Sequence, residues 1–131
     1  MKAAYIDTSC ILAVYFEEPR YRGILDTLLE YEEIFSSNLL EAELRAVLLR
    51  EGFESSEPEL LKRFIWVLPG RALSREIKVV LSKGYLRGAD LWHLACALFL
   101  RDSIGAVEFV SLDRKQVRVA RDLAFDVAAW G

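Results

Sequence analysis

The regular alternation of short apolar runs with longer helical patterns is the feature that most constrains the fold of this chain. Residues 3–6, 33–37, 106–112 and 125–130 have the pattern of strands, and a segment of helical spacing follows each of the first three. No Asn-Gly pair or similar hairpin signal joins two strand runs. Strands separated by helices pair in parallel. We therefore expect an α/β fold of three layers, in which helices cover both faces of a central, mostly parallel sheet of about five strands.

The helical patterns differ in how clearly they begin and end. Pro19 ends the first pattern and Gly52 closes the third. Residues 53–60 are typical of a loop, with a helix starting near Pro58. The run "FIWVLPG" (64–70) fits either a short strand or the buried end of that helix, because its periodicity does not decide between them. The helical patterns occupy residues 8–18, 21–31, 38–52, 72–84, 87–100 and 114–124.

Length and composition favour one globular domain over residues 1–131. The chain has 131 residues, of which 53% are hydrophobic and 28% charged, and this is enough to build one core. Its apolar runs are too short for a bilayer span, and the start "MKAAYIDTS" is too short in apolar residues for a signal peptide. We therefore expect a cytoplasmic protein without membrane contact. Cys10 and Cys96 stand in apolar surroundings, so we expect buried thiols rather than a disulfide or zinc site.

The charges are distributed unevenly along the chain. Residues 1–61 contain 5 lysines and arginines against 13 acidic residues, whereas residues 62–131 contain 12 against 7. A surface that binds a polyanion would therefore come mainly from the second half of the chain. Taken singly, most of these charges are also explained by solvated helix faces.

Three aspartates stand at junctions between elements. Asp7 directly follows the strand at 3–6, Asp113 follows the strand at 106–112, and Asp90 opens the helix at 87–100. Because parallel strands end at the same edge of a sheet, Asp7 and Asp113 are expected to point into one crevice. Each aspartate has a structural alternative, since aspartate is a preferred N-cap residue and each of the three precedes or opens a helix.

Glu43 needs a partner inside the fold. Leu40, Glu43, Leu44 and Val47 are spaced as one stripe of a helix, so Glu43 shares an apolar face where an unpaired carboxylate is costly. A buried pair with an arginine is the structural alternative to a metal site. Glu41 differs, because its spacing from Asn38 and Arg45 explains it as a capping and surface-pair residue.

Four carboxylates predict an oxygen-rich site for a hard cation. Mg²⁺ or Mn²⁺ suits carboxylates and retained waters, whereas zinc prefers imidazoles and thiolates. Without a cation, four like charges in one crevice repel one another and raise some of their pKa values. A divalent ion relieves this repulsion and activates water against a phosphodiester. The candidate metal ligands are Asp7, Glu43, Asp90 and Asp113.

Four segments of the chain resemble the successive motifs of PIN-domain ribonucleases, in particular the VapC-type toxins of toxin–antitoxin pairs. These segments are "YIDTSCILAVYF", "LLEAELRAVL", "RGADLWHLACAL" and "VEFVSLDRKQVRVA", in the family's order and spacing over nearly the whole chain. The resemblance implies an α/β/α fold and assigns Asp7, Glu43, Asp90 and Asp113 to an acidic site for Mg²⁺ or Mn²⁺. It also places the hydroxyls of Ser9 and Ser111 beside that site, with Ser111 where the family often has threonine.

The resemblance implies a metal-dependent endoribonuclease that leaves a 5′-phosphate and a 3′-hydroxyl. Arg87 and Arg114 flank the acidic residues and are the candidate phosphate contacts. Tyr85 and Trp92 are candidates for base stacking, although core packing also explains Trp92. The chemistry needs no histidine base, and His93, within the apolar helix, is expected to be a hydrogen-bonded core residue. A longer basic track would comprise Arg71, Arg75, Lys78 and Lys83, although a solvated helix face explains this spacing equally well.

The resemblance also implies protein partners, namely a small antitoxin that covers the site and a second copy of the chain in a homodimer. Tyr15, Phe16 and Leu28 are the apolar residues expected on that surface. The alternative is a catalytically silent PIN-like module that binds RNA or protein. An aspartyl-nucleophile phosphatase or a receiver domain fits less well, because Ser9 stands where the phosphatase has its second aspartate and "IDTS" lacks the receiver's acidic pair.

Overall fold

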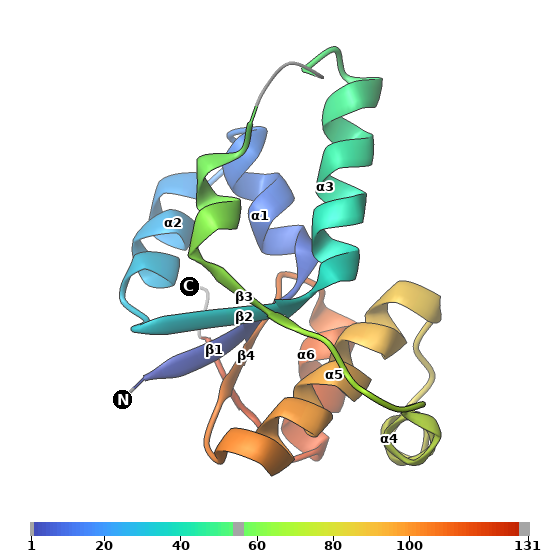
Figure 1. The fold of residues 1–131 in the computed structure, drawn as a ribbon. Helices are drawn as coiled ribbons and strands as arrows, with labels where there is room; N and C mark the ends of the chain where they lie inside the picture. The colour runs from blue at the N-terminus through green and yellow to red at the C-terminus, as the bar shows by residue number, and fades with distance from the viewer. Residues whose placement is uncertain (1, 54–56, 129–131) are drawn as a thin grey trace.

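The computed structural model describes residues 2–53 and 57–128, and within them a five-stranded parallel sheet forms the centre of the molecule (Figure 1). The strands lie in the order β3-β2-β1-β4-β5, and every neighbouring pair is parallel. The predicted α/β class and parallel sheet are therefore confirmed. The strands are β1 (Ala3–Ile6), β2 (Glu33–Ser37), β3 (Phe64–Val67), β4 (Glu108–Val110) and β5 (Asp126–Val127).

Helices cover both faces of the sheet, which confirms the three-layer arrangement (Figure 1). One layer contains α1 (Thr8–Tyr15), α2 (Tyr21–Leu29) and α3 (Asn38–Arg50), together with the 3-10 helix η1 (Glu59–Arg63). The other layer contains α4 (Ser74–Leu81), α5 (Gly88–Ile104) and α6 (Arg114–Asp122). Within the described residues, no helix combines the length and apolar character that crossing a bilayer requires.

Strand β1 supplies side chains to both hydrophobic layers, and all four of its residues are buried. Ala4 and Ile6 pack in the core with α1, α2 and α3, whereas Ala3 and Tyr5 pack in the core with α4, α5 and α6. This follows from the alternation of side chains along a strand, since a central parallel strand has no face in water. Cys10 and Cys96 are free and buried, as expected.

The direction of the chain across the sheet reverses beside β1. The chain passes from β1 to β2 and β3 on one side, and then returns to β4 and β5 on the other. The Asp7 N–H donates to the Val110 carbonyl over 2.9 Å, so the carboxyl ends of β1 and β4 are joined directly. In open parallel sheets, a crevice for ligands forms at such a reversal.

The structure decides the segments that periodicity left open. "FIWVLPG" contains strand β3, because Phe64 and Val67 are buried against β2 and the core. The helix expected near Pro58 is the single 3-10 turn η1. Gly52 ends the α3 region at a φ of 86°, a conformation that glycine adopts without strain. The last strand, expected over 125–130, comprises Asp126–Val127, and residues 129 and 130 lie outside the described part of the chain.

The prediction that Leu28 lies on an exposed apolar surface is wrong, and Tyr15 and Phe16 are only partly exposed. Leu28 is 1% exposed in the core beneath α2. Tyr15 and Phe16 are partly buried against the same core, and the Tyr15 hydroxyl accepts a hydrogen bond from the Leu60 N–H. Helical spacing placed these residues on helices, but the packing of α1 against α2 and η1 turned them inward.

Candidate acidic site

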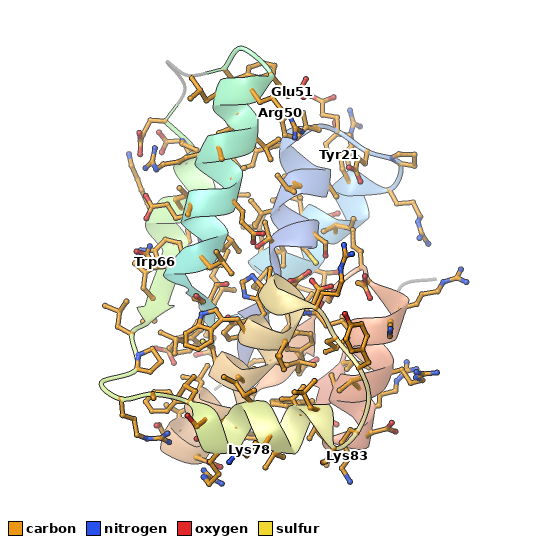
Figure 2. The ribbon with its side chains drawn as sticks, turned by 90° about the vertical axis from the view of Figure 1, so that its right-hand side faces the viewer. Tyr21, Arg50, Glu51, Trp66, Lys78 and Lys83 are labelled. Carbon is orange, nitrogen blue, oxygen red and sulfur yellow. The ribbon has the colours of Figure 1, made fainter. Side chains whose placement is uncertain are left out.

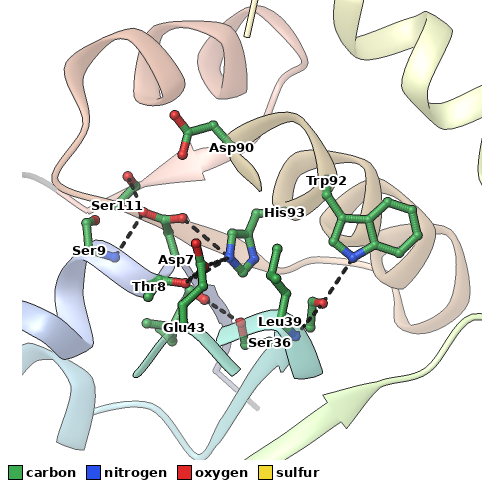
Figure 3. Close-up of polar contacts among 12 residues, drawn as sticks. Asp7, Thr8, Ser9, Ser36, Leu39, Glu43, Asp90, Trp92, His93 and Ser111 are labelled. Atoms are coloured by element: carbon green, nitrogen blue, oxygen red, sulfur yellow. Dashed lines mark hydrogen bonds and ion pairs between the residues drawn. The ribbon is translucent and has the colours of Figure 1, made fainter. Parts of the chain in front are cut away.

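Asp7 is the fixed centre of the site (Figure 3). Its Oδ2 accepts from the Ser9 N–H at 3.2 Å, so the N-cap role is real, and it also lies 3.2 Å from the Ser111 hydroxyl. Gln116 Nε2 lies 3.5 Å from Oδ1. The Asp7 carboxylate is buried and surrounded by hydrogen-bond donors, so its negative charge is held at the end of β1.

Glu43 reaches the same site from α3. Thr8 Oγ1 donates to Glu43 Oε1 over 2.7 Å, and His93 Nε2 lies 3.6 Å from the same oxygen. The neighbouring His93 ring and the Thr8 hydrogen bond lower the pKa of Glu43, although partial burial acts in the opposite direction. The predicted inward position of Glu43 is therefore confirmed. Its partners are a threonine and a histidine, not the arginine of the structural alternative.

A directed hydrogen-bond chain connects Tyr5, His93, Thr8 and Glu43. The Thr8 hydroxyl has one proton, which it donates to Glu43, so its oxygen accepts from His93 Nε2–H over 2.9 Å. At the other ring nitrogen, the Tyr5 hydroxyl lies 2.7 Å from Nδ1 and accepts from the Ser37 N–H. Burial raises the pKa of Tyr5, so the phenol keeps its proton. Both ring nitrogens of His93 are therefore engaged, Nδ1 by Tyr5 and Nε2 by Thr8.

His93 lies in the core, as predicted, and it also contacts the acidic site, which the sequence analysis did not predict. His93 is 1% exposed, and both of its ring nitrogens are hydrogen-bonded. It lies 88 residues from Tyr5 along the chain and 85 from Thr8. No periodicity within α5 reports such contacts, because they depend on how α5 packs across the ends of β1.

Gln116 is a second residue that the sequence reading missed. It is 0% exposed, its Nε2 donates to the Asp90 carbonyl over 3.1 Å, and its Oε1 lies 2.6 Å from the Ser111 hydroxyl. The signal for it was present, since Gln116, Val119, Ala120 and Leu123 form one buried stripe, the same spacing that singled out Glu43. Gln116 ties the starts of α5 and α6 to the end of β4.

The two expected hydroxyls join the strand ends around Asp7. Ser9 Oγ accepts from the Leu112 N–H over 3.1 Å, which links α1 to the segment after β4. Ser111 Oγ accepts from the Asp113 N–H and lies within hydrogen-bond distance of Asp7 and Gln116. A hydroxyl has one proton, so Ser111 donates to one of these two acceptors at a time.

Asp90 is the carboxylate whose pKa is raised by the other three acidic side chains. The N-cap of α5 is Arg87, and Asp90 lies in the first turn, so the prediction that Asp90 could cap its helix is wrong. Desolvation raises its pKa, and the nearby charges of Asp7, Asp113 and Glu43 raise it further. Among residues 2–53 and 57–128, no lysine or arginine forms an ion pair with Asp90, and no donor hydrogen-bonds to its carboxylate (Figure 3).

Asp113 completes the group from the start of α6. Its Oδ1 caps the helix by accepting the Gln116 N–H over 2.8 Å, as the structural alternative for this residue predicts. The side chain is nevertheless exposed and close enough to raise the pKa of Asp90. Capping and a place in the acidic group are therefore compatible at Asp113.

The basic residues around the site divide into paired and unpaired groups. Arg71 and Arg75 both bind the buried Glu76 carboxylate, and Arg75 also binds Asp102. These ion pairs already occupy both arginines within the fold, and the longer basic track through them stays a prediction. Trp92 donates its Nε1–H to Ser37 Oγ and packs against the core, which supports packing rather than base stacking. The residues Arg87, Arg114, Lys78, Lys83 and Tyr85 remain exposed.

The donor set suits a hard cation in type and charge. All four candidate ligands offer carboxylate oxygens, and their coupling to Asp90 shows that they share one electrostatic environment. Within the described residues, however, no three acidic, histidine or cysteine side chains are close enough together to enclose an ion as they stand. Asp7 is buried and fixed by hydrogen bonds, whereas Glu43, Asp90 and Asp113 are partly or fully exposed.

The fold and the site together define a class of parallel α/β proteins with a group of acidic side chains where the sheet reverses direction. Comparison with known families gives the particular one, because the PIN domain family matches residues 4–122. The chain belongs to the PIN domain family. PIN domains are generally Mg²⁺-dependent nucleases, so this membership supports a nuclease-type function. Comparison with curated proteins gives no match.

Proposed function

We propose that this protein is a Mg²⁺- or Mn²⁺-dependent endoribonuclease that hydrolyses phosphodiester bonds in RNA. The observation that carries the proposal is the position of Asp90, a partly buried carboxylate close to the charges of Asp7, Asp113 and Glu43 and without a lysine or arginine partner among the described residues. A divalent cation is the group that such a cluster lacks. The family's nuclease-type function supplies the reaction class.

Each acidic residue has a distinct part in this proposal. Asp7 is the rigid ligand, because Ser9, Ser111 and Gln116 hold its two oxygens. Asp90 lies in the first turn of α5, where the positive end of the helix dipole favours a carboxylate. Glu43 and Asp113 are the outer ligands, which bind directly or through water. When bound, the cation lowers the pKa of water and stabilises negative charge on the phosphate.

The proposal assigns no general-base histidine. His93 is 1% exposed, and its two ring nitrogens are engaged by Tyr5 and Thr8. A group in this state is poorly placed to take a proton from a substrate in the crevice. Its part in the proposal is to hold Thr8, and through Thr8 the carboxylate of Glu43.

Cleavage of a labelled single-stranded RNA tests the proposal. We expect the wild-type protein to cut the RNA in Mg²⁺ or Mn²⁺ and to stop in EDTA, leaving a 5′-phosphate and a 3′-hydroxyl. Asp7→Asn and Asp90→Asn are expected to lower the rate by about 100-fold or more. Asp26→Asn on α2 is the matched control, because it removes the same charge from an exposed position and is expected to cleave normally.

The same experiment separates the enzyme from the catalytically silent binding module. Equal background cleavage by the wild type, Asp7→Asn and Asp90→Asn would contradict the nuclease and leave the binding module. Metal-dependent cleavage that Asp26→Asn retains and Asp90→Asn loses would support the nuclease.

We further propose that the nuclease is the toxin of a toxin–antitoxin pair, acting in the cytoplasm as a homodimer that a small antitoxin inhibits. Support for this finer assignment is the ordered resemblance of four motifs to VapC-type toxins. Expression in the native host is expected to arrest growth, and Asp90→Asn to abolish the arrest. A short upstream reading frame should encode the protein that relieves it. Light scattering of the purified chain tests the dimer.

A further inference from the structure

A groove with arginines on its walls lies beside the acidic site. It encloses about 740 Å³ between the turn that follows α1 and the exposed face of α6. Ser111 and Leu112 line one part of it, and Ser111 contacts Asp7. The groove therefore adjoins the acidic crevice. The lining residues are Glu18, Pro19, Arg20, Ile24, Ser111, Leu112, Arg114, Val117, Arg121 and Ala128.

The charge of the groove is opposite to that of the crevice. Three arginines and one glutamate line it. Arg114 and Arg121 form no ion pair with any described residue, whereas Arg45, Arg71 and Arg75 are each bound to carboxylates. Two exposed guanidinium groups without an internal partner can therefore bind an external anion without breaking a contact in the fold.

The spacing of the two arginines suits a linear polyanion. Arg114 and Arg121 are separated by two turns of α6, with Val117 between them on the same side, so their Cα atoms stand roughly 10 Å apart along the helix axis. At this spacing, the two side chains can each reach a different phosphate of one strand. Among the described residues that line the groove there is no aromatic ring to stack on a base.

We propose that this groove binds the phosphate backbone of a single-stranded nucleic acid as the strand leaves the acidic site, with Arg114 and Arg121 as the phosphate contacts. The inference rests on the proposed nuclease function, because the strand is the substrate of the neighbouring site. The inference adds that the part of the strand on one side of the acidic site lies along α6. It also adds that the groove contacts the phosphate backbone rather than the bases. Arg20 adds positive charge from the opposite wall.

The test compares two double variants with the same change in charge. Arg114→Gln/Arg121→Gln removes the groove cations, and Arg50→Gln/Arg63→Gln removes two exposed arginines, one at the end of α3 (Figure 2) and one at the end of η1. Among the described residues, Arg63 forms no ion pair and Arg50 pairs with the exposed Glu51 beside it. The affinity for a fluorescent single-stranded RNA is measured by anisotropy in Ca²⁺, and a gel confirms that the RNA stays intact.

The groove variant is expected to bind RNA about tenfold more weakly at low salt, and the Arg50→Gln/Arg63→Gln variant to stay close to wild type. Loss of two phosphate contacts also makes the slope of log K against log salt concentration less negative by roughly 1.4. The ratio of wild-type to groove-variant affinity is therefore expected to fall about sevenfold between 50 and 200 mM salt. Oligo-A, oligo-U and a DNA strand of equal length are expected to show the same factor. Equal affinity of the two variants would overturn the groove assignment, and a loss confined to one base composition would overturn the backbone assignment.

The result is independent of cleavage. If the wild type shows no metal-dependent cleavage, the proposed nuclease function is contradicted, but the binding comparison is still valid. If the wild type cleaves RNA with metal and the two variants bind RNA equally well, the groove assignment is contradicted and the nuclease function is supported.

Discussion

Thr8 is the point at which the hydrogen-bond chain can be cut without changing the shape of the core. Thr8→Val removes the hydroxyl and keeps a β-branched side chain of similar volume. The substitution deletes the 2.7 Å hydrogen bond to the Glu43 carboxylate and the acceptor that His93 Nε2–H uses at 2.9 Å. It therefore tests whether these contacts hold Glu43 and His93 in place.

The expected cost follows from the two lost hydrogen bonds. A hydrogen bond to a charged group contributes about 1.5–3 kcal/mol, and an unsatisfied buried donor costs about 1–3 kcal/mol. Two features of the site reduce the sum. Glu43 is 35% exposed, so water replaces one bond, and His93 Nε2 lies 3.6 and 3.7 Å from the Glu43 and Asp7 carboxylates, toward which it can move. We expect a loss of about 2 kcal/mol in the free energy of unfolding, or about 8 °C in Tm.

Glu43 also makes the effect depend on pH. Its pKa lies below the ordinary 4.5, so its ionised form stabilises the fold above that pH, and this contribution is lost as the pH falls through the lowered pKa. Thr8→Val removes one cause of the shift. The pKa of Glu43 is expected to rise, and the difference in unfolding free energy between wild type and variant to narrow as the pH falls below 4.5.

Urea unfolding at several pH values and NMR titration of the glutamate carboxyls measure both quantities. Thr27→Val is the matched control, because Thr27 is the second threonine of the chain and hydrogen-bonds only to the Gly23 carbonyl of its own helix. Its cost is expected to stay within about 0.5 kcal/mol. If Thr8→Val unfolds like Thr27→Val and the pKa of Glu43 does not move, the proposed coupling is refuted.

Three further predictions concern the charges. Asp90 has a pKa above its ordinary 3.8, so the fold is favoured while Asp90 is neutral and loses this contribution as the pH rises through the raised pKa. Asp90→Asn is therefore expected to raise the metal-free Tm at neutral pH and to leave it unchanged below pH 3.8. Thermal melts at several pH values measure this difference. Mg²⁺ at 100 times its Kd is expected to stabilise the wild type by about 2.7 kcal/mol, roughly 10 °C in Tm, and to stabilise Asp90→Asn much less; an equal response would contradict the metal site. Glu76→Gln is expected to cost about 2 kcal/mol at pH 7, because Glu76 is 1% exposed and bound by Arg71 and Arg75. The Arg71 guanidinium lowers the pKa of Glu76 to about 2, so urea unfolding should show the cost disappearing as the pH falls from 4.5 toward 2.

The candidate site was partly readable from local pattern. Asp7 and Asp113 followed from strand ends, because parallel strands finish at one edge, and Glu43 followed from its place on an apolar stripe. Gln116 occupies an equally apolar stripe, so the same argument applies to it. The prediction that Asp90 could cap its helix is wrong because the helix begins at Gly88, which places Asp90 inside the first turn.

The sequence by itself determined most of the elements and the layers, since strand and helix periodicities are local and each apolar face must be buried against another. The tertiary structure alone decided which side chains meet. Tyr5, Thr8 and His93 come together because α5 crosses the carboxyl end of β1, and Leu28 is covered because α2 packs into the core. Such contacts join residues up to 109 positions apart, as in Gln116 and Asp7, and they depend on packing between elements that no periodicity within one element records.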